Sequence, residues 1–163
     1  MIELGFEIKG YPRSGRRVEL EDNLSRVSRP DLIQGAFMGD AIVKFDAVDF
    51  STHFGWVTLL DWCLRLTVAI RELADTGSAR FSFSESDDFM SFRRADEGLH
   101  VTCSYVPEVG VIDHQEELAI AVRGFVDSKL AWISQEFPEA MNNPVMVDVY
   151  SRIGRPFPSR DDL

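Results

Sequence analysis

Strict alternation of apolar and polar residues is the clearest pattern along the chain. Residues 79–84, 89–94 and 99–105 each place large apolar side chains at every second position, and acidic turns separate them. A period of two gathers these side chains on one face of a strand. The pattern therefore predicts a three-stranded antiparallel meander, with residues 109–112 as a short extension.

The N-terminal third carries weaker extended patterns. Residues 2–9 alternate cleanly and predict an amphipathic strand, whereas Val18–Leu24 is either a second strand or an irregular segment. Leu32–Met38 and Ala41–Phe50 are also expected to be extended. Gly39-Asp40 between them is typical of a tight turn.

A long apolar segment, Phe54–Asp75, predicts the central helix. Ser51 or Thr52 is the candidate N-cap, and Gly77 is the expected stop. This segment is apolar on nearly every side, and such a helix is normally covered on more than one face.

A second helix is predicted from Gln115 to Phe137 by its single apolar stripe. Asp113 and Glu116 have the spacing of an acidic capping box at its start. Residues 145–150 are expected to form a last strand, and residues 151–163 an irregular tail.

The order of the elements predicts the fold class. Strands come first, followed by a helix, a meander and a helix, which is typical of segregated α+β structure. The simplest architecture is one curved antiparallel sheet of about five to seven strands with two long helices packed on one face. The central helix would lie between the sheet and the second helix. Residues 1–150 would form a single domain, followed by the tail.

Composition narrows the class of partner. The chain has 163 residues and a net charge of −10, which disfavours nucleic acid and anionic membranes. Neither a signal peptide nor an apolar run of about 20 residues is evident, so the cytoplasm is the expected location. The two cysteines, Cys63 and Cys103, are flanked by apolar residues and read as small core residues.

Candidate catalytic chemistry is sparse in this sequence. His53, His100 and His114 lack the spacing of a metal site, and no nucleophile elbow or phosphate-binding loop occurs. The basic turn around Arg13, Arg16 and Arg17 lacks the glycines of a phosphate cradle, so it is expected to be a solvated turn. We therefore expect neither an enzyme nor a bound cofactor or metal.

Charge is more informative than any motif. Nine carboxylates and two arginines lie between residues 84 and 117, a net charge of −7. They fall mainly in turns, where they form either a solvated surface or a docking surface for a basic protein. The candidate interface residues are Glu85, Asp87, Asp88, Asp96 and Glu97, with Trp56 and Trp62 as aromatic anchors.

Several short motifs support a family resemblance. They are Gly39-Asp40, Phe54-Gly55-Trp56, Leu59-Leu60-Asp61, Phe83-Ser84-Glu85, Phe92-Arg93-Arg94 and Phe137-Pro138-Glu139. Across residues 33–144 the chain resembles small bacterial α+β proteins that are similar to the immunity proteins of toxin systems. The resemblance implies a small, acidic, cytoplasmic protein that neutralises a toxin by binding it. It implies no particular functional residue.

Three hypotheses follow. The first is a protein-binding module, an immunity-like inhibitor of a basic toxin or effector. The second is a small-molecule-binding or enzymatic domain with a pocket between the sheet and the central helix, where Asp61, Arg65, Arg93 and Arg94 would be the polar groups. The third is a homodimer in which a second copy covers the extra apolar face of the central helix.

Overall fold

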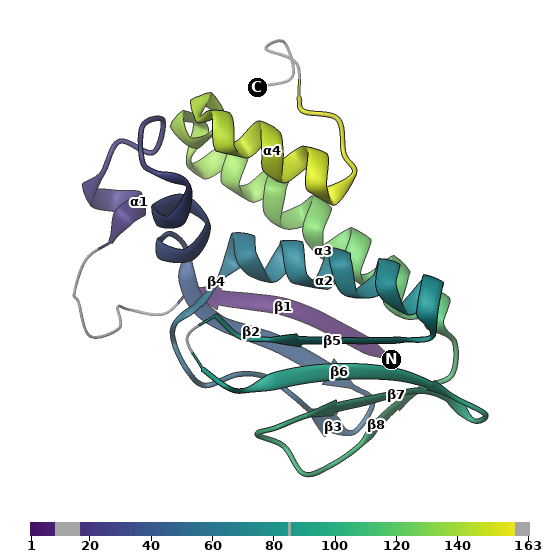
Figure 1. Cartoon of the computed structure of the whole chain (residues 1–163). Helices are drawn as coiled ribbons and strands as arrows, with labels where there is room; N and C mark the ends of the chain where they lie inside the picture. Colours follow the sequence, from purple (N-terminus) through teal and green to yellow (C-terminus); the bar gives the residue numbers. More distant parts are fainter. Residues whose placement is uncertain (9–16, 85, 159–163) are drawn as a thin grey trace.

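Two four-stranded antiparallel sheets lie under a layer of helices in the computed structural model (Figure 1). The structure describes residues 1–8, 17–84 and 86–158. The predictions made for Arg13, Arg16 and Glu85 lie outside the described residues. The strands are β1 (Ile2–Ile8), β2 (Met38–Phe45), β3 (Val48–Asp49), β4 (Val57–Thr58), β5 (Ser78–Ser82), β6 (Phe89–Ala95), β7 (Gly98–Cys103) and β8 (Gly110–Ile112).

The first sheet is built around β2. This strand pairs with the whole of β1, from Ile2 opposite Phe45 to Ile8 opposite Gly39, and with the short strands β3 and β4. The second sheet has the order β5-β6-β7-β8 and contains the predicted meander with its extension. The α+β class and the antiparallel pairing are therefore confirmed.

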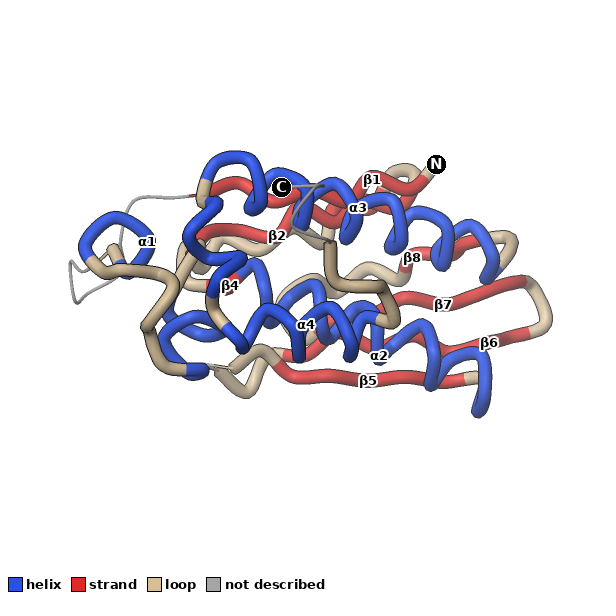
Figure 2. The backbone as a smooth tube through the Cα atoms, turned by 90° about the horizontal axis from the view of Figure 1, so that it is seen from above, coloured by secondary structure: helices blue, strands red, loops and turns tan. Residues whose placement is uncertain are grey.

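The single continuous sheet predicted from the sequence is wrong. The two sheets lie edge to edge, with β8 beside β2 (Figure 2), but the segment after β3 occupies the edge of β2. The amides of Phe50 and Thr52 donate to the carbonyls of Val43 and Ala41. This edge is therefore already hydrogen-bonded, and side chains join the sheets instead: the Tyr105 hydroxyl donates to the Phe50 carbonyl at 3.0 Å.

Helices cover one face of both sheets (Figure 1). The α-helices are α1 (Val18–Glu21), α2 (Leu59–Thr76), α3 (Gln115–Glu136) and α4 (Pro144–Ile153), and shorter turns are η1 (Asp31–Gly35) and η2 (Pro138–Asn142). α2 packs on β5, α3 packs on β1, and both contact each other. The expectation that α2 would lie under the second long helix is therefore wrong. It is α4 that covers α2, as a third layer.

The central helix is shorter than predicted. It begins at Leu59 with Thr58 as its N-cap, and neither Ser51 nor Thr52 caps it. Residues 54–56 form a loop because Gly55 has a positive φ of 72° and its amide donates to the buried Asp40 carboxylate at 2.8 Å. Val57–Thr58 then form β4. The predicted stop is confirmed, since Gly77 is left-handed at φ 77°.

Five further local predictions are wrong. Gly39-Asp40 lies inside β2 and is not a turn, and most of Leu32–Met38 is the helical turn η1. Residues 145–150 belong to helix α4 and are not a strand, so the first residues of the predicted tail are helical as well. At the start of α3 the expected capping box is absent: His114 is the N-cap, and no side chain makes a capping bond there.

Candidate functional site

Four carboxylates meet at one end of the second sheet. Asp96 and Glu97 form the β6–β7 turn, and Asp113 and Glu116 stand at the start of α3. Together they line an open hollow of about 700 Å³. We call these four residues the acidic end. Two of them were predicted interface residues, and Asp113 and Glu116 join them because β8 leads the chain back beside the turn.

Two basic side chains at the acidic end, Arg94 and His100, contact neighbouring residues. Arg94 lines the same hollow and donates a hydrogen bond to Gln115. His100 Nε2 lies 2.8 Å from Glu97 Oε1. The backbone near Glu97, and then His100, lower the pKa of the Glu97 carboxyl below its usual range. The Glu97 carboxylate therefore stays ionised near neutral pH.

The remaining predicted acidic residues lie elsewhere. Asp87 and Asp88 belong to the β5–β6 turn, at the opposite end of β6 from Asp96 and Glu97. Asp88 has a local role, since its carboxylate accepts hydrogen bonds from Ser104 Oγ at 2.7 Å and Ser86 Oγ at 3.1 Å. The candidate interface residues are thus divided between two ends of the meander.

The two predicted aromatic anchors differ in accessibility. Trp62 is 1% exposed and stacks on Phe83 with ring centroids 5.9 Å apart, so its side chain belongs to the core and is not an anchor for a partner. Trp56 is half-buried and stacks on Phe54 at 4.8 Å. Only Trp56 of the two presents surface to a partner.

The predicted Asp61–Arg65 pair is present. Arg65 Nε donates to Asp61 Oδ2 at 2.6 Å, and the Ser84 hydroxyl, itself accepting from Arg65 at 3.0 Å, donates to the same carboxylate at 2.7 Å. The pair borders a groove of about 400 Å³ with an apolar floor of Leu64, Val68 and Phe81. In the homodimer hypothesis a second copy covers the exposed apolar face of α2. This groove is the part of that face that stays exposed, and Val68 is 47% exposed in it.

The four polar groups of the small-molecule hypothesis do not come together. Arg93 alternates with the buried Phe92 along β6 and so faces the side of the sheet without helices. Arg94 is at the acidic end, whereas Asp61 and Arg65 lie beside the groove along α2. The space between α2 and the sheets is occupied by buried core side chains such as Leu66 and Phe92.

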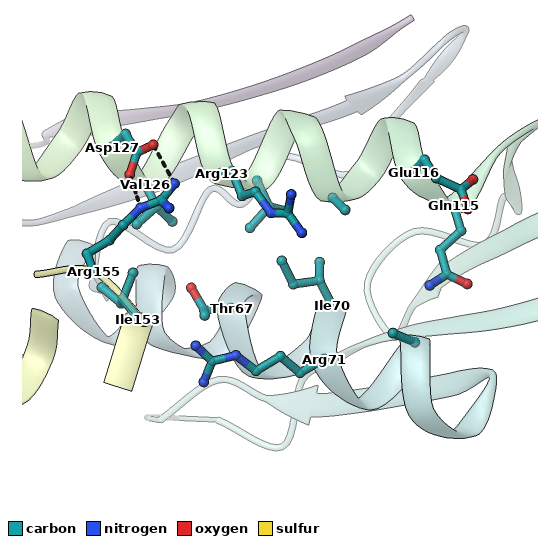
Figure 3. A pocket seen from close by; sticks show the side chains of 14 residues that line it. Thr67, Ile70, Arg71, Gln115, Glu116, Arg123, Val126, Asp127, Ile153 and Arg155 are labelled. Atoms are coloured by element: carbon teal, nitrogen blue, oxygen red, sulfur yellow. Dashed lines mark hydrogen bonds and ion pairs between the residues drawn. The ribbon is translucent and has the colours of Figure 1, made fainter. Parts of the chain in front are cut away.

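A cavity of about 480 Å³ opens between α2, α3 and the residues after α4 (Figure 3). Three arginines line it: Arg71 from α2, Arg123 from α3 and Arg155 after α4. Arg155 forms a two-point ion pair with Asp127, at 2.8 and 2.7 Å, and this pairing raises the pKa of Arg155. Arg71 donates to the Arg152 carbonyl at 2.7 Å.

Sequence reasoning missed this cavity. Arg71, Arg123 and Arg155 lie far apart in the chain, and none belongs to a recognisable motif. The available signal was Asn143-Pro144, a helix N-cap followed by proline at the first helical position. Recognising α4 would have placed Arg155 at the end of a helix that covers α2.

The structure also places the possible metal ligands, the histidines, the cysteines and the apolar helices. Within the described residues, no three His, Cys, Asp or Glu side chains are grouped to hold a metal ion. His53 and His114 are exposed. Both cysteines are free and buried. Over the described ranges, none of the helices combines the length and apolarity needed to cross a bilayer.

Comparison with known proteins adds no relative: the chain matches no family model, no curated protein and no solved structure.

Proposed function

We propose that this protein is a protein-binding module that docks a basic partner through its acidic end. The observation that carries the proposal is the convergence of Asp96, Glu97, Asp113 and Glu116 on one open hollow. Carboxylates that line one hollow repel one another, and a cationic partner relieves that repulsion. The net charge of −10 adds a long-range field that steers such a partner towards the molecule.

Apolar surface adjoins the acidic end. Val111 on β8 is 38% exposed, and its register partner His100 is the residue that pairs with Glu97. An exposed valine beside a carboxylate cluster offers contact area to a partner that charge has already brought close. In the immunity-like form of the proposal, the partner is a basic toxin or effector domain, and occupation of its active surface inhibits it.

The test uses the proteins encoded beside this gene as candidate partners, each purified in an inactive form and titrated by calorimetry. Asp96→Lys/Asp113→Lys reverses two exposed charges at the acidic end. Glu136→Lys/Glu139→Lys is the matched control, because it makes the same change in net charge on exposed residues at and just after the far end of α3. We expect the first variant to weaken binding at least about tenfold and the control to change it little.

Salt supplies a second measurement in the same experiment. Affinity should fall as sodium chloride rises, since steering between exposed charges is screened beyond about 10 Å at 0.1 M salt. Two results contradict the proposal: no neighbouring protein binds at micromolar affinity, or the two double variants weaken binding equally.

A further inference from the structure

We infer that the cavity between α2, α3 and the end of α4 binds a small organic anion, a phosphate or carboxylate group joined to a short apolar body. This site adjoins the proposed docking surface, since Glu116 lines both, but three arginines give it the opposite charge. Three features of the cavity support this inference: guanidinium groups without a carboxylate partner among the described residues, an arginine held in place, and an apolar wall.

Unpaired positive charge is the first feature. Of the three arginines in the cavity, Arg155 is neutralised by both oxygens of Asp127. Within the described part of the chain, Arg71 and Arg123 have no carboxylate partner. The protein has 27 acidic and 17 basic residues, so a guanidinium has abundant potential partners. Glu116 also lines this cavity, but among the described residues it forms no ion pair with either arginine. Two such guanidinium groups in one cavity favour an anion between them.

The arrangement is partly preorganised. Arg71 is held by its bond to the Arg152 carbonyl, and Gly154 leaves room for it. A Cβ at Gly154 would stand 2.8 Å from Arg71 Nη2. Arg71 uses one of its five N–H donors in that bond, and the remaining donors are available to a ligand. A guanidinium fixed before binding loses less entropy when a ligand arrives.

The cavity wall is apolar on the helix sides. Ile70 of α2 and Val126 of α3 face the space between the helices, and Ile153 closes one end (Figure 3). The buried Thr67 hydroxyl lies between the guanidinium groups of Arg71 and Arg155 in the same view, and it donates to the Cys63 carbonyl at 2.8 Å. A cavity of 480 Å³ with this lining suits a small ligand that has a charged head and an apolar body.

The test titrates the full chain with phenyl phosphate, benzoate and benzylamine at constant ionic strength. Phenyl phosphate and benzoate share an apolar ring and differ in the head group, so they distinguish phosphate from carboxylate. Benzylamine carries the ring with a positive charge. We expect at least one of the two anions to bind by calorimetry and to raise the melting temperature, and benzylamine to do neither.

Two variants and a control locate the site. Arg123→Gln removes an exposed side chain that has no partner among the described residues, so the fold should be unaffected; binding should weaken about tenfold or more. Ala119→Trp fills the cavity from α3 and should abolish binding without altering any charge. Arg26→Gln, at an exposed arginine outside the cavity, should leave affinity unchanged.

The inference is overturned if neither anion binds more tightly than benzylamine, or if Arg26→Gln weakens binding as much as Arg123→Gln. Arg123→Gln decides the matter alone if Ala119→Trp does not fold. None of these variants replaces a residue of the acidic end. A negative result for anion binding therefore says nothing about the proposed docking surface, and a negative result for docking says nothing about the anion site.

Discussion

At the residue scale, Asn143 shows how one side chain settles a segment whose pattern is ambiguous. The segment after it is rich in valine and alternates well enough to predict a strand, yet it forms α4. The Asn143 side-chain oxygen Oδ1 accepts from the Val145 amide at 3.0 Å, which starts the helix. Its amide group donates to the Leu24 and Val27 carbonyls, at 2.8 and 3.0 Å. The helix start is thereby fixed to a loop more than a hundred residues earlier.

We expect Asn143→Ala to lower the free energy of unfolding by about 3 kcal/mol, because it removes a helix cap and leaves buried carbonyls without donors. Asn142→Ala is the matched control: this neighbour is exposed, and its loss should cost less than about 0.5 kcal/mol. Urea unfolding of both variants measures the difference. If Asn143→Ala is as stable as Asn142→Ala, then Asn143 does not hold α4 in place.

At the element scale, regular patterns were predictable and long-range contacts were not. The meander, α3 and the end of α2 followed from alternation, an apolar stripe and Gly77. The start of α2 did not, because residues 54–56 are held as a loop through Asp40 and Val57–Thr58 pair with β2 as β4. The acidic end was half predictable, since the β6–β7 turn was foreseen, whereas its meeting with α3 depends on the path of β8. The arginine cavity was not predictable, because it depends on α4, and the alternation of residues 145–150 predicted a strand there.

The joint between the two sheets gives a prediction at this scale. Gly110 in β8 lies against the buried ring of Phe50, and a Cβ there would stand 2.8 Å from Phe50 Cε2. Phe50 is fully buried, so its ring has no room to move aside. We expect Gly110→Ala to destabilise the protein by about 2 kcal/mol through overpacking.

Gly124 in α3 provides a control of opposite sign. A Cβ at Gly124 meets nothing within 4 Å, and the residue is exposed in the interior of a helix. Gly124→Ala should therefore stabilise the protein by about 0.5–1 kcal/mol. Thermal unfolding of both variants checks the pair. A Gly110→Ala protein as stable as the parent would mean that the sheets are free to separate at this joint.

At the scale of the whole molecule, one core links all the layers. A single cluster of buried side chains runs through both sheets, α2, α3 and α4. The two cysteines sample different parts of it: Cys63 lies in α2, and Cys103 lies at the end of β7 in the second sheet. Both are buried, and neither is joined to the other. They can therefore report whether the first 150 residues unfold as one domain, as the sequence predicts.

Cysteine alkylation in increasing urea tests this cooperativity. Burial raises the pKa of Cys63 to about 12 and also raises the pKa of Cys103, so in the folded protein at about pH 8 neither thiol supplies the reactive thiolate. Unfolding returns both groups towards their ordinary pKa, and iodoacetamide then modifies them. Because the core is continuous, mass spectrometry should find both cysteines modified with the same urea midpoint. If Cys103 reacts at clearly lower urea than Cys63, the second sheet opens separately and the chain has two cooperative units.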